Sequence, residues 1–233
     1  MSALEFRVLG PVEVINGGSP LVIGRGKALE VLATLLASPN QGISLDTLTE
    51  TVWHARPPAD PRATLHGVVA RLRRLIGSGY IETLPSGYRF GAAADCLDLL
   101  RFERLVAAAD REQPGGDALG LLTEAIGLWR GTPFGNVSLP ALLNGVVPRL
   151  TQQYLAVCEK WAGLGLQAGR HDAVVARLAV LVDEHPFRER MAGQLMLGLY
   201  RSGRQADAIA VYESVRRALS DEMGIDPGPE LQG

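Results

Sequence analysis

The sequence predicts an α+β part over residues 1–94, followed by an all-α part over residues 95–233. Three observations predict this fold class. Short apolar and β-branched runs bounded by turn residues occur at the start of the chain and again at residues 80–90, with helical spacing between them. Beyond residue 98 only helical spacing recurs. A chain of 233 residues is also long enough for two domains of about 100–200 residues each.

The first 23 residues predict a small antiparallel sheet. Residues 5–9 and 12–15 are apolar or alternate in polarity, and Gly10-Pro11 lies between them. Asn16-Gly17-Gly18 is a strong turn signal before the apolar run Leu21-Val22-Ile23. This order of segments and turns is typical of short paired strands.

Three helices are expected between the predicted strands. From Lys27, leucines at helical spacing form one stripe, which ends at Ser38-Pro39-Asn40. Ser44 can cap the second helix. Asp60 and Pro61 begin the third helix, the first as a capping carboxylate and the second where no amide donor is missed.

The third helix, which runs to Gly77, has a core face and a basic outward face. At 100° per residue, four apolar side chains fall on one side: Leu65, Val69, Leu72 and Ile76. Small or basic residues occupy the other side and its flanks: Arg62, Ala63, Thr64, His66, Gly67, Ala70, Arg71, Arg73 and Arg74. Between residues 56 and 91, six arginines accompany only two acidic residues, which gives a local charge of +4. Such a patch suits a polyanion, and a solvated helix face is the alternative.

Residues 80–90 predict a hairpin whose turn is Pro85-Ser86-Gly87, with Arg89 near its tip. Three helices, the last one basic outward, followed directly by a hairpin are the order of parts in a winged helix-turn-helix. In that arrangement the third helix enters the major groove of DNA, and the hairpin reaches toward the minor groove. Residues 1–94 are therefore predicted to form a DNA-binding domain.

Eight side chains are predicted to bind nucleic acid: Lys27, Arg62, Thr64, His66, Arg71, Arg73, Arg74 and Arg89. Lys27 and Thr64 can reach phosphates, the helix arginines can supply groove contacts, and the hairpin arginine is placed for a narrow minor groove. The centre of the helix, with Gly67, Val68 and Ala70, has little hydrogen-bonding capacity. Methyl contacts to thymine are therefore expected there.

The all-α part contains a repeat. Gly169-Arg170 and Gly203-Arg204 stand 34 residues apart, which is the tetratricopeptide period, and apolar helical patterns flank both. Residues 102–128 predict an earlier copy, and the stretch 131–148, with three prolines, interrupts the repeat. Stacked helical hairpins present concave protein-binding surfaces, so this part is expected to bind protein. An inert scaffold is the alternative.

The motifs, in their order, resemble the Streptomyces antibiotic regulatory protein family. The matching segments span almost the whole chain: residues 6–14, 48–53, 57–58, 62–65, 71–74, 87–90, 98–103, 128–131, 184–190, 199–206 and 219–229. The resemblance implies an OmpR-type winged helix over residues 1–94 and a tetratricopeptide-like bacterial transcriptional activation domain over residues 95–233. It also implies binding to direct repeats near the −35 region and recruitment of RNA polymerase holoenzyme to a secondary-metabolite (antibiotic) gene cluster. We expect a homodimer on this promoter DNA.

The loop from His54 to Asp60 is long and rich in proline. In similar proteins this loop faces polymerase, so Arg56 and Asp60 are expected to contact the sigma or alpha subunit. A rigid connector is the alternative for this loop. For the whole chain, the alternative function is a protein-interaction adaptor, in which the winged helix no longer reads DNA and the helical repeats bind a partner.

No enzymatic activity, cofactor or metal site is predicted. Gly24-Arg25-Gly26-Lys27 is similar to a phosphate-binding loop, but Leu21 stands where that motif needs glycine and Ala28 where it needs serine or threonine. The four histidines lack metal-ligand spacing, and Cys96 and Cys158 are expected to be small buried residues. Because the sequence has neither a membrane-length apolar run nor a signal-peptide pattern, a cytoplasmic, nucleoid-associated location is expected.

Overall fold

The computed structural model describes residues 4–54, 57–113 and 115–232, which fold into two compact units. The first unit contains the chain up to residue 114 together with residues 124–153. The second contains residues 115–123 and 154–233. The first unit thus includes segments from both sides of the domain boundary expected near residue 94, and that boundary stays a prediction.

An antiparallel sheet begins the chain, as the turn signals predicted. β1 (Leu4–Arg7) pairs with β2 (Glu13–Asn16), which pairs in turn with β3 (Ser19–Pro20). Gly17 and Gly18 join the last two strands, and both adopt positive φ angles that favour glycine. The third strand lies just before the apolar run at residues 21–23, which instead leads toward the first helix.

Three helices follow within the first unit: α1 (Lys27–Leu36), α2 (Leu45–Trp53) and α3 (Pro61–Ile76). Both predicted caps are confirmed. The Ser44 hydroxyl accepts a hydrogen bond from the backbone N–H of Thr47 at 3.0 Å. The Asp60 carboxylate accepts one from the backbone N–H of Ala63 at 2.9 Å. These bonds satisfy amide donors that have no partner within the helix, and so they mark where α2 and α3 begin.

A second sheet has the strand order β4 (Gly42–Ser44), β6 (Gly87–Phe90), β5 (Ile81–Leu84), and its strands are antiparallel. β5 and β6 form the predicted hairpin, which turns at Pro85 and Ser86. β4 was not predicted from the sequence, and its pairing makes β6 the central strand. A Cβ at Gly87 would collide with the carbonyl oxygen of Ile43, so only glycine fits where β6 meets β4.

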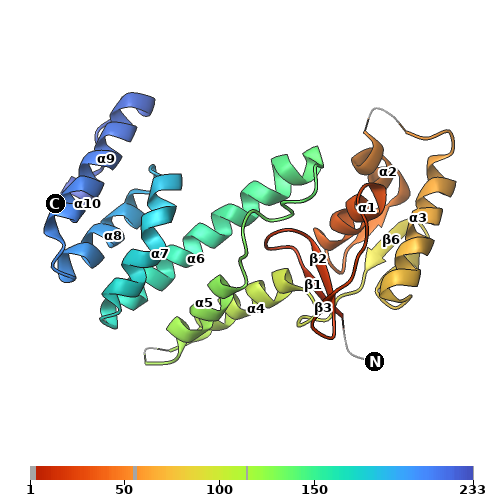
Figure 1. Ribbon diagram of the computed structural model, residues 1–233, viewed down its shortest axis with the longest axis horizontal. Helices are drawn as coiled ribbons and strands as arrows, with labels where there is room; N and C mark the ends of the chain where they lie inside the picture. Colours follow the sequence, from red (N-terminus) through yellow and green to blue (C-terminus); the bar gives the residue numbers. More distant parts are fainter. Residues whose placement is uncertain (1–3, 55–56, 114, 233) are drawn as a thin grey trace. The chain divides into compact units, whose positions relative to one another are not determined.

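The apolar face predicted for α3 is confirmed. Four side chains on it are at most 2% exposed: Leu65, Val69, Leu72 and Ile76. This face packs against α1, which is itself buried along most of its length and also contacts α2 and β6. Figure 1 shows the three helices gathered beside β6. The opposite face of α3 is left without a covering element among the described residues.

Helices replace strands after residue 97. α4 (Asp98–Arg111) and α5 (Ala118–Gly127) form the first predicted helical pair. Residues 128–139 form neither helix nor strand, and the chain then passes through the π-helix η1 (Leu142–Val146) into α6 (Val147–Gln167). An interruption of the repeat is therefore confirmed, but it spans residues 128–139 and is shorter than predicted, because residues 140–148 are already helical. Pro148 comes just after the π-helical turn η1, where the regular α-helical hydrogen-bond pattern is already broken.

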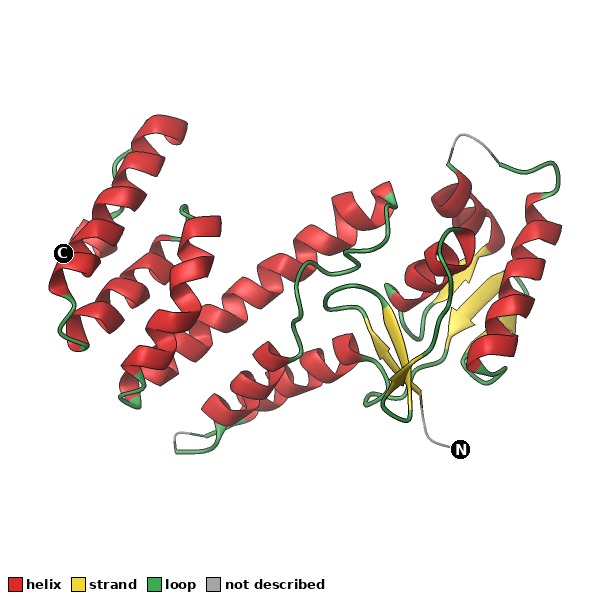
Figure 2. Cartoon of the chain, viewed as in Figure 1, coloured by secondary structure: helices red, strands yellow, loops and turns green. Residues whose placement is uncertain are grey.

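The second unit consists of helices, as Figure 2 shows. After α6 come α7 (His171–Glu184), α8 (Glu189–Arg201), α9 (Gln205–Met223) and α10 (Pro229–Gln232). The turns at Gly169 and Gly203 are alike. Each glycine has a positive φ, and the next residue donates its N–H to the carbonyl five positions earlier. The backbone thus repeats after 34 residues, and the closer likeness to tetratricopeptide repeats stays a prediction.

The predicted fold class is confirmed, because an α+β region precedes an all-helical one. Cys96 and Cys158 are buried free thiols, as expected. Within residues 4–54, 57–113 and 115–232, no helix combines the length and the apolar character needed to cross a membrane.

Candidate nucleic-acid interface

The outward face of α3 is a surface of small and basic side chains. Ala63, Thr64, Gly67 and Ala70 are exposed along it, and Val68 is half-buried. A Cβ at residue 67 would meet nothing within 4 Å, so this part of the helix is open. A flat, open helix face can approach a groove closely, and its specificity then depends on the longer side chains around it.

Arg71 and Arg74 are the exposed arginines of this face. Within the described part of the chain, neither side chain has a hydrogen bond or an ion pair. A Cβ at Gly24 would stand 3.6 Å from Nη2 of Arg71, so that guanidinium lies beside the loop that precedes α1. The two residues are three positions apart and therefore share one side of the helix.

Arg25, in the loop beside Arg71, is a further exposed arginine that sequence reasoning missed. It is exposed, stands between Gly24 and Gly26, and also has no hydrogen bond or ion pair among the described residues. From the sequence, this loop is similar only to a phosphate-binding motif, and that motif is incomplete. A count of the arginines outside the third helix could have found Arg25, but the contact between the loop and Arg71 depends on the tertiary fold.

Arg73 is already engaged within the protein. Its Nε and Nη2 atoms donate to the carbonyl oxygen of Ile81 at 2.9 and 2.6 Å, and Nη2 also donates to Oγ1 of Thr83 at 2.8 Å. Its guanidinium carbon lies 5.7 Å from the centre of the Tyr88 ring. Arg73 therefore fastens α3 to the hairpin, whereas the sequence analysis placed it among the groove contacts.

Arg89 lies in a different place from the one expected. The sequence analysis put it near the tip of the hairpin, but the register pairs it with Glu82 in the middle of the two strands. The two side chains form an ion pair, with Nε donating to Oε2 at 2.9 Å. The tip itself consists of Pro85 and Ser86, which are both exposed. The sequence could not show this, because cross-strand partners depend on the register.

Lys27 is held at the start of α1. Its Nζ atom donates to Glu30 at 2.7 Å and to the carbonyl oxygen of Val52 at 2.6 Å, and it lies 6.0 Å from the centre of the Trp53 ring. The side chain is nevertheless 44% exposed. The ammonium group is therefore accessible, while its bond to the Val52 carbonyl oxygen holds it beside the end of α2.

The other candidate residues are weakly held. Arg62 lies 3.5 Å from Asp46, and both side chains are mostly exposed, so this pair contributes little. The Thr64 hydroxyl donates back to the carbonyl of Asp60 at 2.7 Å. His66 is exposed, and its ring meets the ring of Tyr88 edge to face at 6.0 Å. Burial raises the pKa of that tyrosine.

Of the two residues predicted to contact polymerase, only Asp60 lies in the described part of the chain. Asp60 is exposed and carries the cap of α3. Arg56 lies outside the described residues. Among those residues, no cluster of three or more histidine, cysteine, aspartate or glutamate side chains could hold a metal ion.

Comparisons with known proteins decide the family. The profile of the "Bacterial transcriptional activator domain" matches residues 97–233, and that of "Transcriptional regulatory protein, C terminal" matches residues 20–90. Regulatory protein AfsR of Streptomyces coelicolor is 38% identical over 99% of this chain, which spans 24% of AfsR. Transcriptional regulatory protein MoaR1 of Mycobacterium tuberculosis is 34% identical over 99% of this chain and 77% of MoaR1. The chain belongs to the Streptomyces antibiotic regulatory protein family.

A solved structure agrees with this membership of the Streptomyces antibiotic regulatory protein family. Mycobacterium tuberculosis EmbR, solved in complex with a low-affinity phosphopeptide, superimposes on the whole chain with a TM-score of 0.89 and 31% identity, and the chain covers 64% of it. The predicted winged helix followed by an all-helical activator domain is thereby confirmed. Both matched families are families of transcription regulators rather than of enzymes. The β1–β2 hairpin lies outside both matched ranges.

Proposed function

We propose that this chain is a sequence-specific transcriptional activator that places the outward face of α3 in the major groove of promoter DNA. One observation carries the proposal: Arg71 and Arg74 project from an open helix face, and no described residue occupies their guanidinium groups. Guanidinium groups that are free in the protein can neutralise phosphates or bind guanine without breaking an internal bond.

The proposed contacts divide into three classes. Arg25, Arg71 and Arg74 make the first contacts with phosphates and base edges. Lys27, Arg62, Thr64 and His66 lie at the margins and exchange weak internal partners for phosphate oxygens. Arg73 and Arg89 hold the hairpin in place, and any contact that they make with DNA is secondary to this role.

Sequence readout in this proposal uses few hydrogen bonds. Gly67, Val68 and Ala70 offer only apolar groups at the centre of α3. Methyl contacts suit the C5-methyl group of thymine, and a bidentate Arg71 suits guanine. The site that the chain reads therefore contains a thymine step next to a guanine.

Two protomers bind direct repeats near the −35 region. Residues 1–94 grip the DNA, and residues 95–233 dimerise and contact RNA polymerase, together with the loop at residues 54–60. The regulated genes form a secondary-metabolite cluster. This division rests on the family membership and on the small number of free basic groups in one protomer, because few phosphate contacts give weak binding.

A selection experiment followed by a salt titration tests the proposal. Duplexes bound by the purified chain are enriched from a random library, and the affinity for the selected sequence is then measured by fluorescence anisotropy at several salt concentrations. Direct repeats are expected. Arg74→Ala should reduce the slope of log K against log salt by about 0.9, because one phosphate contact is lost.

Arg111→Ala is the matched control, since it removes an exposed arginine from α4. It should leave affinity and slope unchanged. A wild-type chain that selects no sequence and shows no binding at low salt would contradict the proposal. That result would favour the adaptor, whose helical repeats bind protein instead.

A further inference from the structure

The β1–β2 hairpin is held at two places by residues that belong to different matched families. Its turn, residues 8–12, is bonded to the activator domain, which starts at residue 97. Its first strand packs on the winged-helix domain, which is matched at residues 20–90. The hairpin itself lies outside both matched ranges. It therefore joins two sequence domains inside the first compact unit.

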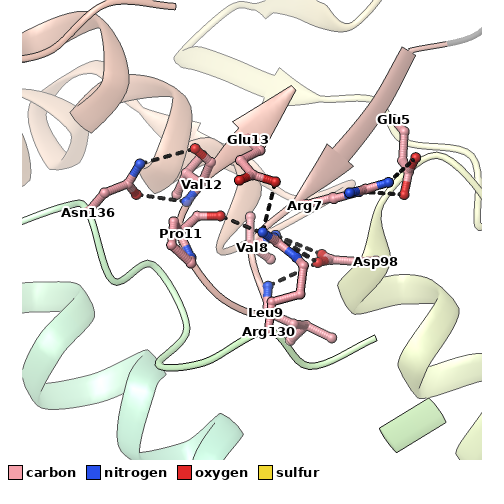
Figure 3. Close-up of polar contacts among 10 residues, drawn as sticks. All are labelled: Glu5, Arg7, Val8, Leu9, Pro11, Val12, Glu13, Asp98, Arg130 and Asn136. Carbon is pink, nitrogen blue, oxygen red and sulfur yellow. Dashed lines mark hydrogen bonds and ion pairs between the residues drawn. The ribbon is translucent and has the colours of Figure 1, made fainter. Parts of the chain in front are cut away.

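Asp98 holds the turn from α4. Its carboxylate, which is 4% exposed, accepts hydrogen bonds from the backbone N–H groups of Val8 at 2.8 Å and Leu9 at 3.0 Å, as Figure 3 shows. Both amides are buried, and this carboxylate is their acceptor. A buried amide without an acceptor is costly, so this bond resists opening.

The loop at residues 130–136 holds the same turn from the other side. The backbone N–H of Arg130 donates to Leu9 O at 2.7 Å, and that of Phe134 donates to Val8 O at 3.0 Å. The Asn136 amide accepts from Val12 N at 2.7 Å and donates to Val12 O at 3.1 Å. The side chain thus pairs with the backbone of Val12, as a neighbouring strand would, just before β2 begins (Figure 3).

The Arg130 guanidinium completes this set of bonds. It donates to the carbonyl of Pro11 at 3.1 Å, pairs with Glu13 at 2.8 Å and lies 3.8 Å from Asp98. Its side chain is 25% exposed. We call Asp98, Arg130 and Asn136 the clip, because these three side chains bind the turn from the activator domain.

The first strand of the hairpin contacts the wing, which is the hairpin of β5 and β6. Phe6 is fully buried, and its ring lies 4.8 Å from that of Phe90 and 5.0 Å from that of Tyr80, edge to face in both cases. The backbone N–H of Leu4 donates to the Tyr80 hydroxyl at 3.2 Å. Phe90 belongs to β6, the central strand of the wing sheet. Only one buried strand therefore lies between the clip and the wing.

We infer that the β1–β2 hairpin couples the activator domain to the wing, and that the clip residues are positioning residues for DNA binding. The inference rests on the proposed function, because the wing matters only if it meets DNA. A clip held closed keeps β1 against Phe90 and keeps the wing at a fixed angle to α3. A change in the activator domain that loosens residues 130–136 would loosen the wing without altering any residue that contacts DNA.

Hydrogen exchange of the protein alone tests the coupling directly. Asn136→Ala and Arg130→Ala, each in the full chain, should raise the exchange rate of the wing peptide at residues 80–90 by about tenfold. The rate over α9 should stay at its wild-type value, since that helix belongs to the second compact unit. Arg111→Ala is the matched control and should change neither peptide.

The outcome that overturns the inference is unchanged exchange in the wing while residues 8–12 exchange faster. The clip would then hold only its own turn. If a variant fails to fold, which circular dichroism would show, Arg130→Lys keeps the charge and removes the fork of donors, and the same comparison decides.

DNA binding supplies the second readout. Clip variants should weaken binding to the selected duplex several-fold with an unchanged salt slope, because no phosphate contact is removed. A slope that falls by about 0.9 in Arg130→Ala would make this residue a DNA contact and overturn its positioning role. If the wild-type chain binds no DNA, the proposed function fails. The exchange experiment still decides whether the β1–β2 hairpin couples the activator domain to the wing.

Discussion

Arginines occur in two regions of the first unit with opposite surroundings. On α3, Arg71 and Arg74 are exposed and have no internal partner in the described chain. At the clip, the Arg130 guanidinium donates to the carbonyl oxygen of Pro11, pairs with Glu13 and lies near the carboxylate of Asp98. The same residue type is therefore free for a ligand in one region and occupied by the protein in the other.

This difference shows that a count of basic residues overstates a binding surface. A guanidinium that is already hydrogen-bonded gains less from a phosphate, because it must first give up its internal partners. By this criterion Arg73 resembles Arg130 more than it resembles its neighbour Arg74. The electrostatic footprint of the protein is then smaller, and lies closer to the loop before α1, than the sequence suggests.

The largest expected effect is on stability, from a substitution in the β1–β2 hairpin that the clip holds. Phe6→Ala removes a fully buried ring that meets two aromatic neighbours. The free energy of unfolding, measured with urea, should fall by about 3–5 kcal/mol, as for other buried phenylalanines. Val22→Ala is the control, since Val22 is 82% exposed, and it should change stability by less than about 0.5 kcal/mol. A loss below about 1 kcal/mol for Phe6→Ala would contradict the packing described for the hairpin.

A pH titration sharpens the comparison at the clip. Burial raises the pKa of Asp98 from 3.8 to about 6, against the opposing effects of the Leu9 and Val8 amides and of Arg130. The folded chain therefore holds this proton more tightly than the unfolded chain does. The stability that it contributes is complete below about pH 4 and is lost as the pH rises through about 6.

Asp98→Asn removes this titration. The unfolding free energy of the wild type, relative to that of the variant, should decrease by at most about 3 kcal/mol as the pH rises from about 4 to about 6.5. The pKa of Glu5 is lowered by Arg7 and responds in the opposite sense, but it is present in both proteins and cancels. A constant difference across this range would mean that Asp98 titrates at its ordinary pKa.

The role of the exposed arginines on α3 is tested by measuring how well the chain distinguishes the selected duplex from a scrambled one. Arg71→Ala should reduce the preference for the selected duplex over a scrambled one by about 1–3 kcal/mol, which is the usual contribution of a bidentate base contact. Arg73→Ala should lower the affinity for both duplexes and preserve their ratio, because its guanidinium is bonded to the hairpin within the protein. Competition titrations at one salt concentration measure both ratios. Equal discrimination by Arg71→Ala and wild type would remove Arg71 from sequence readout.

The sequence predicted local features well. The buried face of α3 follows from periodicity, and the caps at Ser44 and Asp60 follow from the chemistry of amide donors within three residues. The two glycine turns of the helical repeat were also correct. Each of these features is decided by residues near one another in the chain.

Features that depend on distant partners were not predictable. β4 has three residues and no pattern of its own, and only its pairing with β6 makes it a strand. Asp98 is the first residue of α4, a position that suggests a helix cap. Its carboxylate instead accepts hydrogen bonds from the backbone N–H groups of Val8 and Leu9, about ninety positions away. The positions of Arg73 and Arg89 likewise depend on strand register. The sequence therefore predicted the helix of the candidate site and its two faces, but not which of its arginines are bonded within the protein.

The smallest expected effect separates the two roles given to Asp60. Its carboxylate caps α3, so Asp60→Ala should destabilise the protein by about 1 kcal/mol, whereas Asp60→Asn keeps a capping oxygen and should cost much less. A polymerase contact through the negative charge is lost in both variants. Transcription in vitro from a promoter with the selected repeats should therefore fall equally in the two variants at a temperature where both are folded. Activity that is retained by Asp60→Asn and lost by Asp60→Ala would assign Asp60 to the cap alone and make the loop a rigid connector.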